Sequence, residues 1–155
     1  MQALVRDARP ADLDLLVAFN AALAEETEGR RLDAARLRAG VAAALQDPSR
    51  GQYRVAELDG RAVGALLLTR EWSDWRNGWF HWIQSVYVLP QARRRGVYSA
   101  LHADVLARAA AAGDVVGVRL YVEHENVSAQ RTYERLAMER SRYVFYEAAV
   151  PGPAG

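Results

Sequence analysis

The sequence predicts a mixed α/β (α+β) fold, and two local patterns support that prediction. Residues 52–70 contain two strand-like runs joined by Asp59-Gly60, a dipeptide favoured in two-residue hairpin turns. The strand-like run 79–89 is followed by a helical pattern and then by the strand-like run 115–123. A strand–helix–strand unit in one sheet joins parallel strands by a right-handed crossover, so these two runs are expected to pair in parallel.

The other elements follow from capping residues and chain breakers. Residues 2–7 can form a first strand, and Pro10 suits the first turn of a helix that runs to about Glu25. Asp33 is expected to cap a second helix, which ends near Gln46. The last expected elements are a helix over 126–138, a strand over 142–148 and a disordered tail over 151–155. Because no internal linker is visible, residues 1–150 are expected to form a single domain.

Composition limits the classes of function. The chain has 155 residues, of which 25% are charged, and is long enough to bury a sizeable core. Its net charge of +1 argues against general attraction to nucleic acid or to an anionic membrane, so neither partner is expected. The absence of cysteine excludes disulfides, thiolate metal sites and a cysteine nucleophile. No apolar run resembles a signal peptide or a membrane span, so a cytoplasmic protein is expected.

An arginine-rich turn precedes the helix that begins near Gly96. Val97, Leu101 and Val105 recur on one helical face, and the residues just before it are Arg93, Arg94 and Arg95. A helix N-terminus already carries partial positive charge and unpaired N–H groups, so this turn is a predicted anion site. The sequence has neither a P-loop nor a dinucleotide fingerprint, which favours pyrophosphate from another kind of molecule. The alternative is a solvated surface run of charges.

The turn resembles the pyrophosphate loop of the GNAT superfamily of N-acetyltransferases, which reads [QR]-x-x-G-x-[GA]. Residues 93–98 match it, except that Tyr98 stands where glycine or alanine is usual. The preceding SVYVLP resembles the family's fourth strand, whose bulge binds the pantetheine arm through its backbone. The resemblance implies that acetyl-CoA is bound by the following residues: Val86, Tyr87, Val88, Arg93, Arg94, Arg95, Gly96, Val97, Tyr98 and Ser99.

A second stretch resembles the family's N-x-x-A-x-x-Y-x-x-x-G-[FM] motif. Asn126, Ala129 and Tyr133 match it and fall on one helical face, whereas Ala137 replaces the glycine. The resemblance implies that these three residues contact coenzyme A and that Tyr133 donates a proton to the departing thiolate. The alternative interpretation is an N-cap asparagine and a core tyrosine.

Together the two motifs imply the GNAT fold: a mostly antiparallel sheet, a central parallel pair (79–89 and 115–123) splayed around acetyl-CoA, and helices on both faces. The implied reaction is acetyl transfer to a primary amine by direct attack in a ternary complex, without a metal. A small or amino-acid-like amine is the first expectation and a protein amine the second, and a homodimer is possible. The alternative from another class is a non-catalytic acyl-CoA sensor or interaction module.

The base and the acceptor site are left open by the sequence. Many family members place a glutamate where Gln84 and Ser85 stand here, and neither of these can act as a base. The candidates for the base are Glu71, Glu123, His124, Glu25 and His81. Carboxylates beside aromatic faces suit a cationic amine, so the acceptor is expected to bind between an acidic stretch and a hairpin loop. The residues in question are Glu25, Glu26, Glu28, Trp72, Asp74 and Trp75, and Glu71 lies in the same loop.

Overall fold

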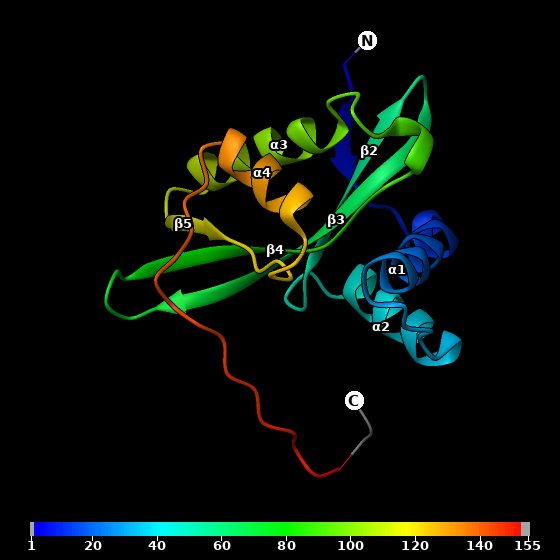
Figure 1. Cartoon of the computed structure of the whole chain (residues 1–155). Coiled ribbons are helices and arrows are strands. Elements are labelled where there is room, and N and C mark those ends of the chain that lie inside the picture. The colour runs from blue at the N-terminus through cyan, green and yellow to red at the C-terminus, as the bar shows by residue number, and fades with distance from the viewer. Residues whose placement is uncertain (1, 153–155) are drawn as a thin grey trace. The chain divides into compact units, whose positions relative to one another are not determined.

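The computed structural model describes residues 2–152, which fall into two compact units divided after Tyr121. The first unit contains β1 (Leu4–Asp7), α1 (Leu13–Glu28), α2 (Ala34–Gln46), β2 (Gln52–Leu58), β3 (Arg61–Ser73), β4 (Gly78–Val88), α3 (Val97–Ala112) and β5 (Val115–Arg119) (Figure 1). Two short 3-10 helices, η1 (Pro10–Asp12) and η2 (Pro90–Ala92), precede α1 and α3. The second unit contains α4 (Val127–Arg135).

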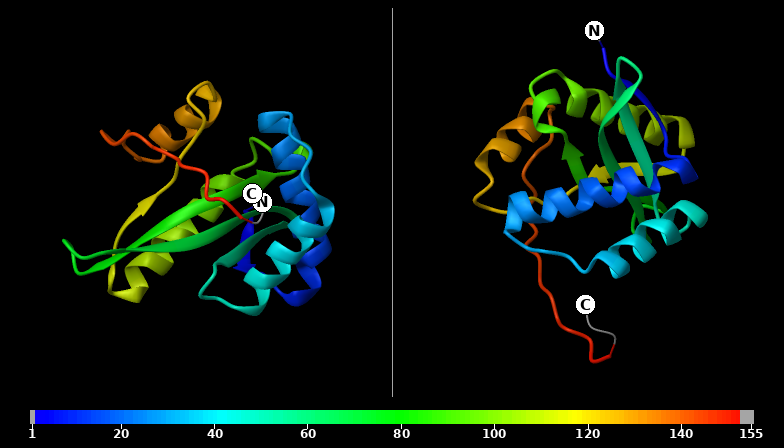
Figure 2. Two further views of the ribbon diagram at one scale, coloured as in Figure 1. Left: turned by 90° about the horizontal axis from the view of Figure 1, so that it is seen from below. Right: turned by 90° about the vertical axis from the view of Figure 1, so that its right-hand side faces the viewer.

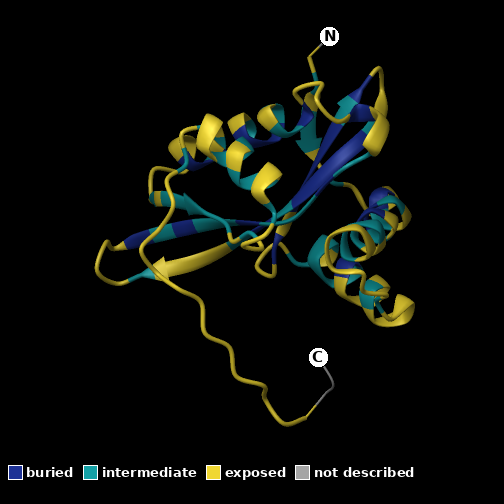
Figure 3. Ribbon diagram, viewed as in Figure 1, coloured by how far each residue is buried: buried dark blue, intermediate teal, exposed yellow. Residues whose placement is uncertain are grey.

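The five strands form one sheet in the order β1-β2-β3-β4-β5, in which every neighbouring pair is antiparallel except the parallel pair β4–β5. Helix α3 covers one face, where Leu101 and Val105 pack with Leu66 of β3. Helices α1 and α2 cover the other face, where Leu16 and Val41 belong to a second buried cluster (Figure 2). The buried residues of β2 and β3 lie between these layers (Figure 3). The predicted mixed sheet with helices on both faces is confirmed.

Local signals placed several boundaries correctly. Asp59 and Gly60 both have positive φ (52° and 72°), as a type I′ hairpin turn requires. The Asp33 side chain accepts a hydrogen bond from the backbone N–H of Arg36, so it caps α2 as predicted. Helix α1, however, continues past the predicted end at Glu25 to Glu28, because the left-handed stop is provided only by Gly29.

The predicted strand over 142–148 is wrong: residues 139–152 form neither helix nor strand. A strand needs a neighbour for its backbone hydrogen bonds, and the described part of the second unit contains no other strand. The predicted helix over 126–138 is also too long, since α4 ends at Arg135 and Ala137 adopts a left-handed φ of 61°. The tail expected to be disordered begins at 151, and its last residues, 153–155, lie outside the described residues. That residues 1–150 form a single domain stays a prediction.

Candidate functional site

The two central strands separate along their length. The parallel pairing of β4 with β5 begins at Trp79–Val115 and ends at Trp82–Arg119. Strand β4 continues to Val88, and no described residue of β5 pairs with it beyond Trp82. This edge of β4 therefore offers backbone N–H and C=O groups to an extended ligand, in the manner of an added strand.

A bulge lies on this part of β4. Ala65 and Leu67 of β3 are two residues apart, but their partners Tyr87 and Gln84 are three residues apart, so β4 has one extra residue. Ser85, within the bulge, has a left-handed φ of 51°. The extra residue changes which backbone groups point out of the ladder. Of the predicted pantetheine-binding residues, Val86 lies within the bulge and Val88 just beyond it.

Glycine allows the end of β4 and the start of α3 to approach β3 closely. A Cβ atom at Gly64 would lie 3.0 Å from the Tyr87 carbonyl oxygen and 3.1 Å from a methyl carbon of Val97. Both contacts are tighter than ordinary side-chain packing allows. The absence of a side chain at Gly64 therefore helps to place the bulge and the arginine turn near each other.

The arginine turn has the backbone geometry of an anion site. Arg94 and Gly96 both have left-handed φ values, 61° and 76°, and Gly96 is the N-cap of α3 without a side-chain cap. The Ala100 N–H bonds to the Gly96 carbonyl at 3.0 Å, so the N–H groups of residues 97–99 precede the helical hydrogen-bond ladder. When residues in the left-handed conformation alternate with residues in other conformations, successive backbone N–H groups point into one concavity. Such a concavity attracts phosphate oxygens.

The three arginines of the turn differ in their partners. Arg94 and Arg95 are exposed, and neither forms a hydrogen bond or an ion pair with another described residue. Arg93 is engaged instead: its Nη2 lies 2.6 Å from Glu26 Oε2, and its Nε donates to the Val88 carbonyl oxygen at 2.9 Å. Two cations are therefore available to an anion at the turn, while the third is bound to a carboxylate.

Among the acidic residues at the end of α1, Glu26 is the one that the tertiary structure distinguishes. Its Oε1 accepts a hydrogen bond from the Tyr87 hydroxyl at 3.0 Å, while its Oε2 binds Arg93. The hydrogen bond from Arg93 lowers the pKa of Glu26, so the carboxylate is ionised at neutral pH. Glu26 thus lies beside the end of β4; it is exposed, as Glu25 and Glu28 are, but it is the one held by Tyr87 and Arg93. A signal was present, because acidic residues in the last turns of a helix oppose its dipole and need another reason to be there.

The candidate bases occupy different environments. The Glu71 Oε1 atom is held by Arg119 at 2.8 Å and by the Trp82 indole N–H at 3.2 Å. In the second unit, Glu123 and His124 are bound to each other, with 2.9 Å between Oε1 and Nδ1, and both side chains are at least half exposed. Glu71 is therefore paired with a cation, and within the described part of the chain no hydrogen bond or ion pair joins it to the arginine turn.

The structure does not bring the hairpin loop to the acidic end of α1. The tip of the β3–β4 hairpin projects away from α1 and α2 (Figures 1 and 2). Successive residues of a strand face opposite sides of the sheet. Trp72 of β3 packs edge-on against Trp79 of β4, with the ring centroids 5.0 Å apart. Trp75 is 88% exposed, and Asp74 accepts a hydrogen bond from its backbone N–H. The structure therefore does not bring these two segments of the first unit together as expected.

The second unit carries the other motif. Asn126 caps α4, since its side-chain oxygen accepts a hydrogen bond from the Ala129 N–H at 3.2 Å. Burial raises the pKa of Tyr133, so its hydroxyl stays protonated at neutral pH and can donate. The asparagine therefore has the capping role of the simpler interpretation, and the tyrosine has the protonation state that a proton donor needs.

Comparison with known proteins identifies the family. Residues 16–138 match the model of the acetyltransferase (GNAT) family, a match that spans most of both motifs and the sheet. The chain belongs to this family. No curated protein sequence matches the chain.

Solved GNAT-like structures agree with this assignment. The structure of a "possible acetyltransferase" from Clostridium difficile 630 is 43% identical, with a TM-score of 0.91 over 98% of this chain and all (100%) of that one. The ribosomal-protein-alanine N-acetyltransferase of Brucella melitensis biovar Abortus 2308 is 18% identical, with a TM-score of 0.76 over 96% of this chain and 99% of that one. At that identity the likeness is one of fold alone.

Membership makes this GNAT protein an acyltransferase, and acetyl-CoA is the donor that the family generally uses. The residues present fit that donor: β4 has an open backbone edge, the turn gathers N–H groups, and Arg94 and Arg95 are available for phosphate. The described residues include no cluster of metal-ligating side chains. No helix in the described part of the chain is both long and apolar enough to cross a bilayer.

Proposed function

We propose that this GNAT protein transfers an acetyl group from acetyl-CoA to a primary amine by direct attack in a ternary complex. A small or amino-acid-like amine is the first choice of acceptor, and a protein amine is the second. The observation that supports this most directly is the open edge of β4, which ends beside an N–H-rich turn where two arginines have no partner among the described residues. An extended thioester arm with a pyrophosphate at one end is complementary to such an edge and turn.

In this proposal the donor is held mainly by backbone groups. Val86 and Val88 would bond the pantetheine arm, and the N–H groups of residues 96–99 would receive the pyrophosphate, assisted by Arg94 and Arg95. Tyr98 would contribute only its backbone, since its ring lies beside that of His102, with 6.1 Å between the centroids. Asn126 and Ala129 are proposed as further contacts on the strength of the motif alone.

Tyr133 is proposed as the acid that protonates the departing thiolate. Its match to the family motif suggests the role, and its raised pKa keeps the proton in place until the C–S bond breaks. The step balances as follows: the amine nitrogen forms a bond to the acetyl carbon, the C–S bond breaks, the phenol gives its proton to the departing thiolate, and the proton that the nitrogen loses on becoming an amide restores the phenol. A base must remove one proton from the ammonium before attack, because a free alkyl amine has a pKa of about 10.

Glu26 is proposed as the carboxylate that attracts the cationic acceptor. It is ionised, and its hydrogen bond from Tyr87 places it beside the unpaired part of β4, along which the acetyl-bearing arm is proposed to bind. Glu25 and Glu28, on the same helix end, would add to the negative potential. Glu71, Glu123 and His124 are kept as proposed bases, to be separated by the pH dependence of their variants.

A thiol-release assay with acetyl-CoA and a panel of amines tests the proposal. The expected result is acceptor-dependent release of free coenzyme A, fastest with amines that carry no negative charge near the nitrogen. If acetyl-CoA binds in calorimetry but no amine or peptide releases thiol, the protein is an acyl-CoA sensor or interaction module. A requirement for a peptide rather than a small amine would establish the second choice of acceptor.

A further inference from the structure

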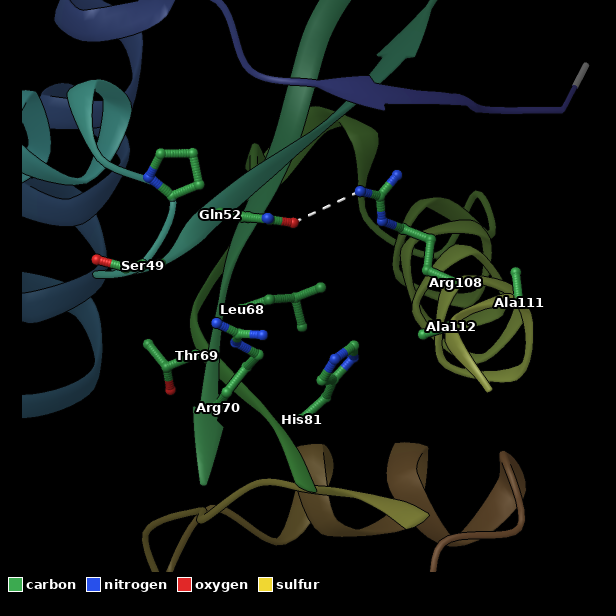
Figure 4. Close-up of a pocket in the computed structure, with 11 residues that line it drawn as sticks. Ser49, Gln52, Leu68, Thr69, Arg70, His81, Arg108, Ala111 and Ala112 are labelled. Atoms are coloured by element: carbon green, nitrogen blue, oxygen red, sulfur yellow. Dashed lines mark hydrogen bonds between the residues drawn. The ribbon is translucent and has the colours of Figure 1, made fainter. Parts of the chain in front are cut away.

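A pocket lies on the α3 face of the sheet, at the end of α3 that is remote from the arginine turn. It has a volume of about 410 Å³ and is lined by β3, β4, the C-terminal turn of α3 and the loop between α2 and β2 (Figure 4). Arg108 of its wall lies eleven residues after Val97, or roughly 16 Å along the helix. The pocket is therefore separate from the donor site proposed above.

The charge of the pocket has one sign. Its ionisable lining residues are Arg70, His81 and Arg108, and no aspartate or glutamate lines it. The Arg70 guanidinium lies over the Trp79 ring, 4.5 Å from the centroid, and makes no ion pair with a described carboxylate. Stacking on an indole holds the planar guanidinium in place while leaving its N–H groups available, which suits bidentate binding of a carboxylate or phosphate.

His81 adds an unsatisfied polar atom. Its Nδ1 is buried, and no described residue provides a hydrogen-bond partner for it. Burial lowers the pKa of His81, and the positive charge of Arg70 lowers it further. Because this Nδ1 atom is almost inaccessible, His81 contributes the surface of its ring to the pocket lining, and its lowered pKa keeps the ring neutral at neutral pH.

Arg108 and the small residues around it shape the other wall. Its guanidinium lies 3.5 Å from the Asp7 carboxylate and 3.5 Å from the Gln52 side-chain oxygen, so its charge is partly neutralised. Ala111 and Ala112 leave the space beside Arg70 open. Arg70 is therefore the main anchor for a charge, while Arg108 completes a positively charged rim.

We propose that this pocket, formed around Arg70, His81 and Arg108, is a binding site for a small organic anion with a carboxylate or phosphate group. Its distance from the arginine turn makes the occupant a separate ligand rather than part of the acetyl-CoA molecule. The volume suits a compact molecule with several oxygens, since ligand sites of roughly 300–1,000 Å³ hold small molecules.

Isothermal titration calorimetry at constant ionic strength tests the site, with citrate and inorganic phosphate as the probes. Saturable binding of at least one probe by the full chain is expected, and the better probe separates carboxylate from phosphate recognition. Arg70→Gln should raise its Kd at least ten-fold. The matched control is Arg61→Gln, an exposed arginine on the same strand outside the pocket, which should leave Kd unchanged.

A second variant tests shape independently of charge. Ala111→Phe fills the pocket and leaves all three basic residues in place, and it should abolish probe binding. Thermal unfolding checks that each variant is folded, and acetyl-CoA affinity should be retained in both, which distinguishes this site from the donor site. The proposal is overturned if neither probe binds the wild type, or if Arg70→Gln and Ala111→Phe bind as the wild type does.

Discussion

Arg93 and Glu26 form an ion pair in which the guanidinium Nη2 lies 2.6 Å from the carboxylate Oε2. The pair joins the turn before α3 to the end of α1, which are far apart in the sequence. One partner belongs to the stretch proposed for pyrophosphate, and the other is the carboxylate proposed for the acceptor amine. A pyrophosphate that draws Arg93 away would therefore release Glu26 for a cationic acceptor, so the two proposed substrates meet at one pair of side chains.

Glu26→Gln should raise the acceptor KM about 10- to 100-fold with kcat nearly unchanged, because a charge-assisted contact made equally in ground and transition states is lost. Acetyl-CoA affinity should not weaken, since Arg93 is freed rather than removed. Steady-state kinetics with varied acceptor measures both. Glu25→Gln and Glu28→Gln, on the same helix end, serve as matched controls with smaller effects. An unchanged KM for Glu26→Gln, with a raised KM for either control, would assign acceptor binding to Glu25 or Glu28 instead.

Replacing Arg94 and Arg95 together by alanine should weaken acetyl-CoA binding about 10- to 100-fold and reduce its dependence on salt. Both guanidinium groups lack partners among the described residues, and contacts with phosphate are charge-assisted. Calorimetry at two salt concentrations provides the measurement, with Arg61→Ala as the control for loss of a surface charge. Equal affinity in the double variant would mean that these arginines are solvated surface.

Tyr133→Phe should lower turnover by about 10² to 10⁴ while leaving acetyl-CoA affinity nearly unchanged. The change removes only the hydroxyl, and general-acid assistance is typically worth that range. Pre-steady-state release of thiol, measured beside the Kd of acetyl-CoA, separates the two effects. Wild-type turnover in the phenylalanine variant would assign protonation of the thiolate to water or to another group.

His102→Leu should reduce the loss of stability in acid. The His102 side chain is only 3% exposed, its Nε2 has no partner among the described residues, and burial lowers its pKa. Because the unfolded pKa is about 6.5 and the folded pKa is lower, the unfolded chain binds more protons as the pH falls below about 6.5. The contribution of neutral, buried His102 to the free energy of unfolding is therefore fully present above that pH. It is lost as the pH falls through the lower folded pKa.

Urea unfolding at pH 7.5 and pH 5.5 measures this effect. The wild type should lose more free energy of unfolding between the two pH values than His102→Leu does. Some loss should persist in the variant, because burial also lowers the pKa of His81. Parallel behaviour of the two proteins would show that His102 does not contribute to the acid sensitivity.

Features decided within a few residues could be predicted well. The Asp59-Gly60 turn, the Asp33 cap of α2 and the Asn126 cap of α4 all depend on local backbone preferences. Such preferences act between neighbours in the chain, so they are visible in the sequence. The parallel pairing of β4 with β5 followed from the strand–helix–strand order through a general rule of connection.

The sequence by itself therefore determined the order of the elements, the mixed sheet and the family to which the protein belongs. Only the tertiary structure decided that Glu26 binds Arg93, that Glu71 binds Arg119 and that the hairpin loop lies away from α1. It also decided that residues 142–148 form no strand, although their side chains favour one. The physical reason is that charge pairing and strand pairing depend on which distant segments meet in space, and strand propensity cannot act without a neighbour to receive the backbone hydrogen bonds.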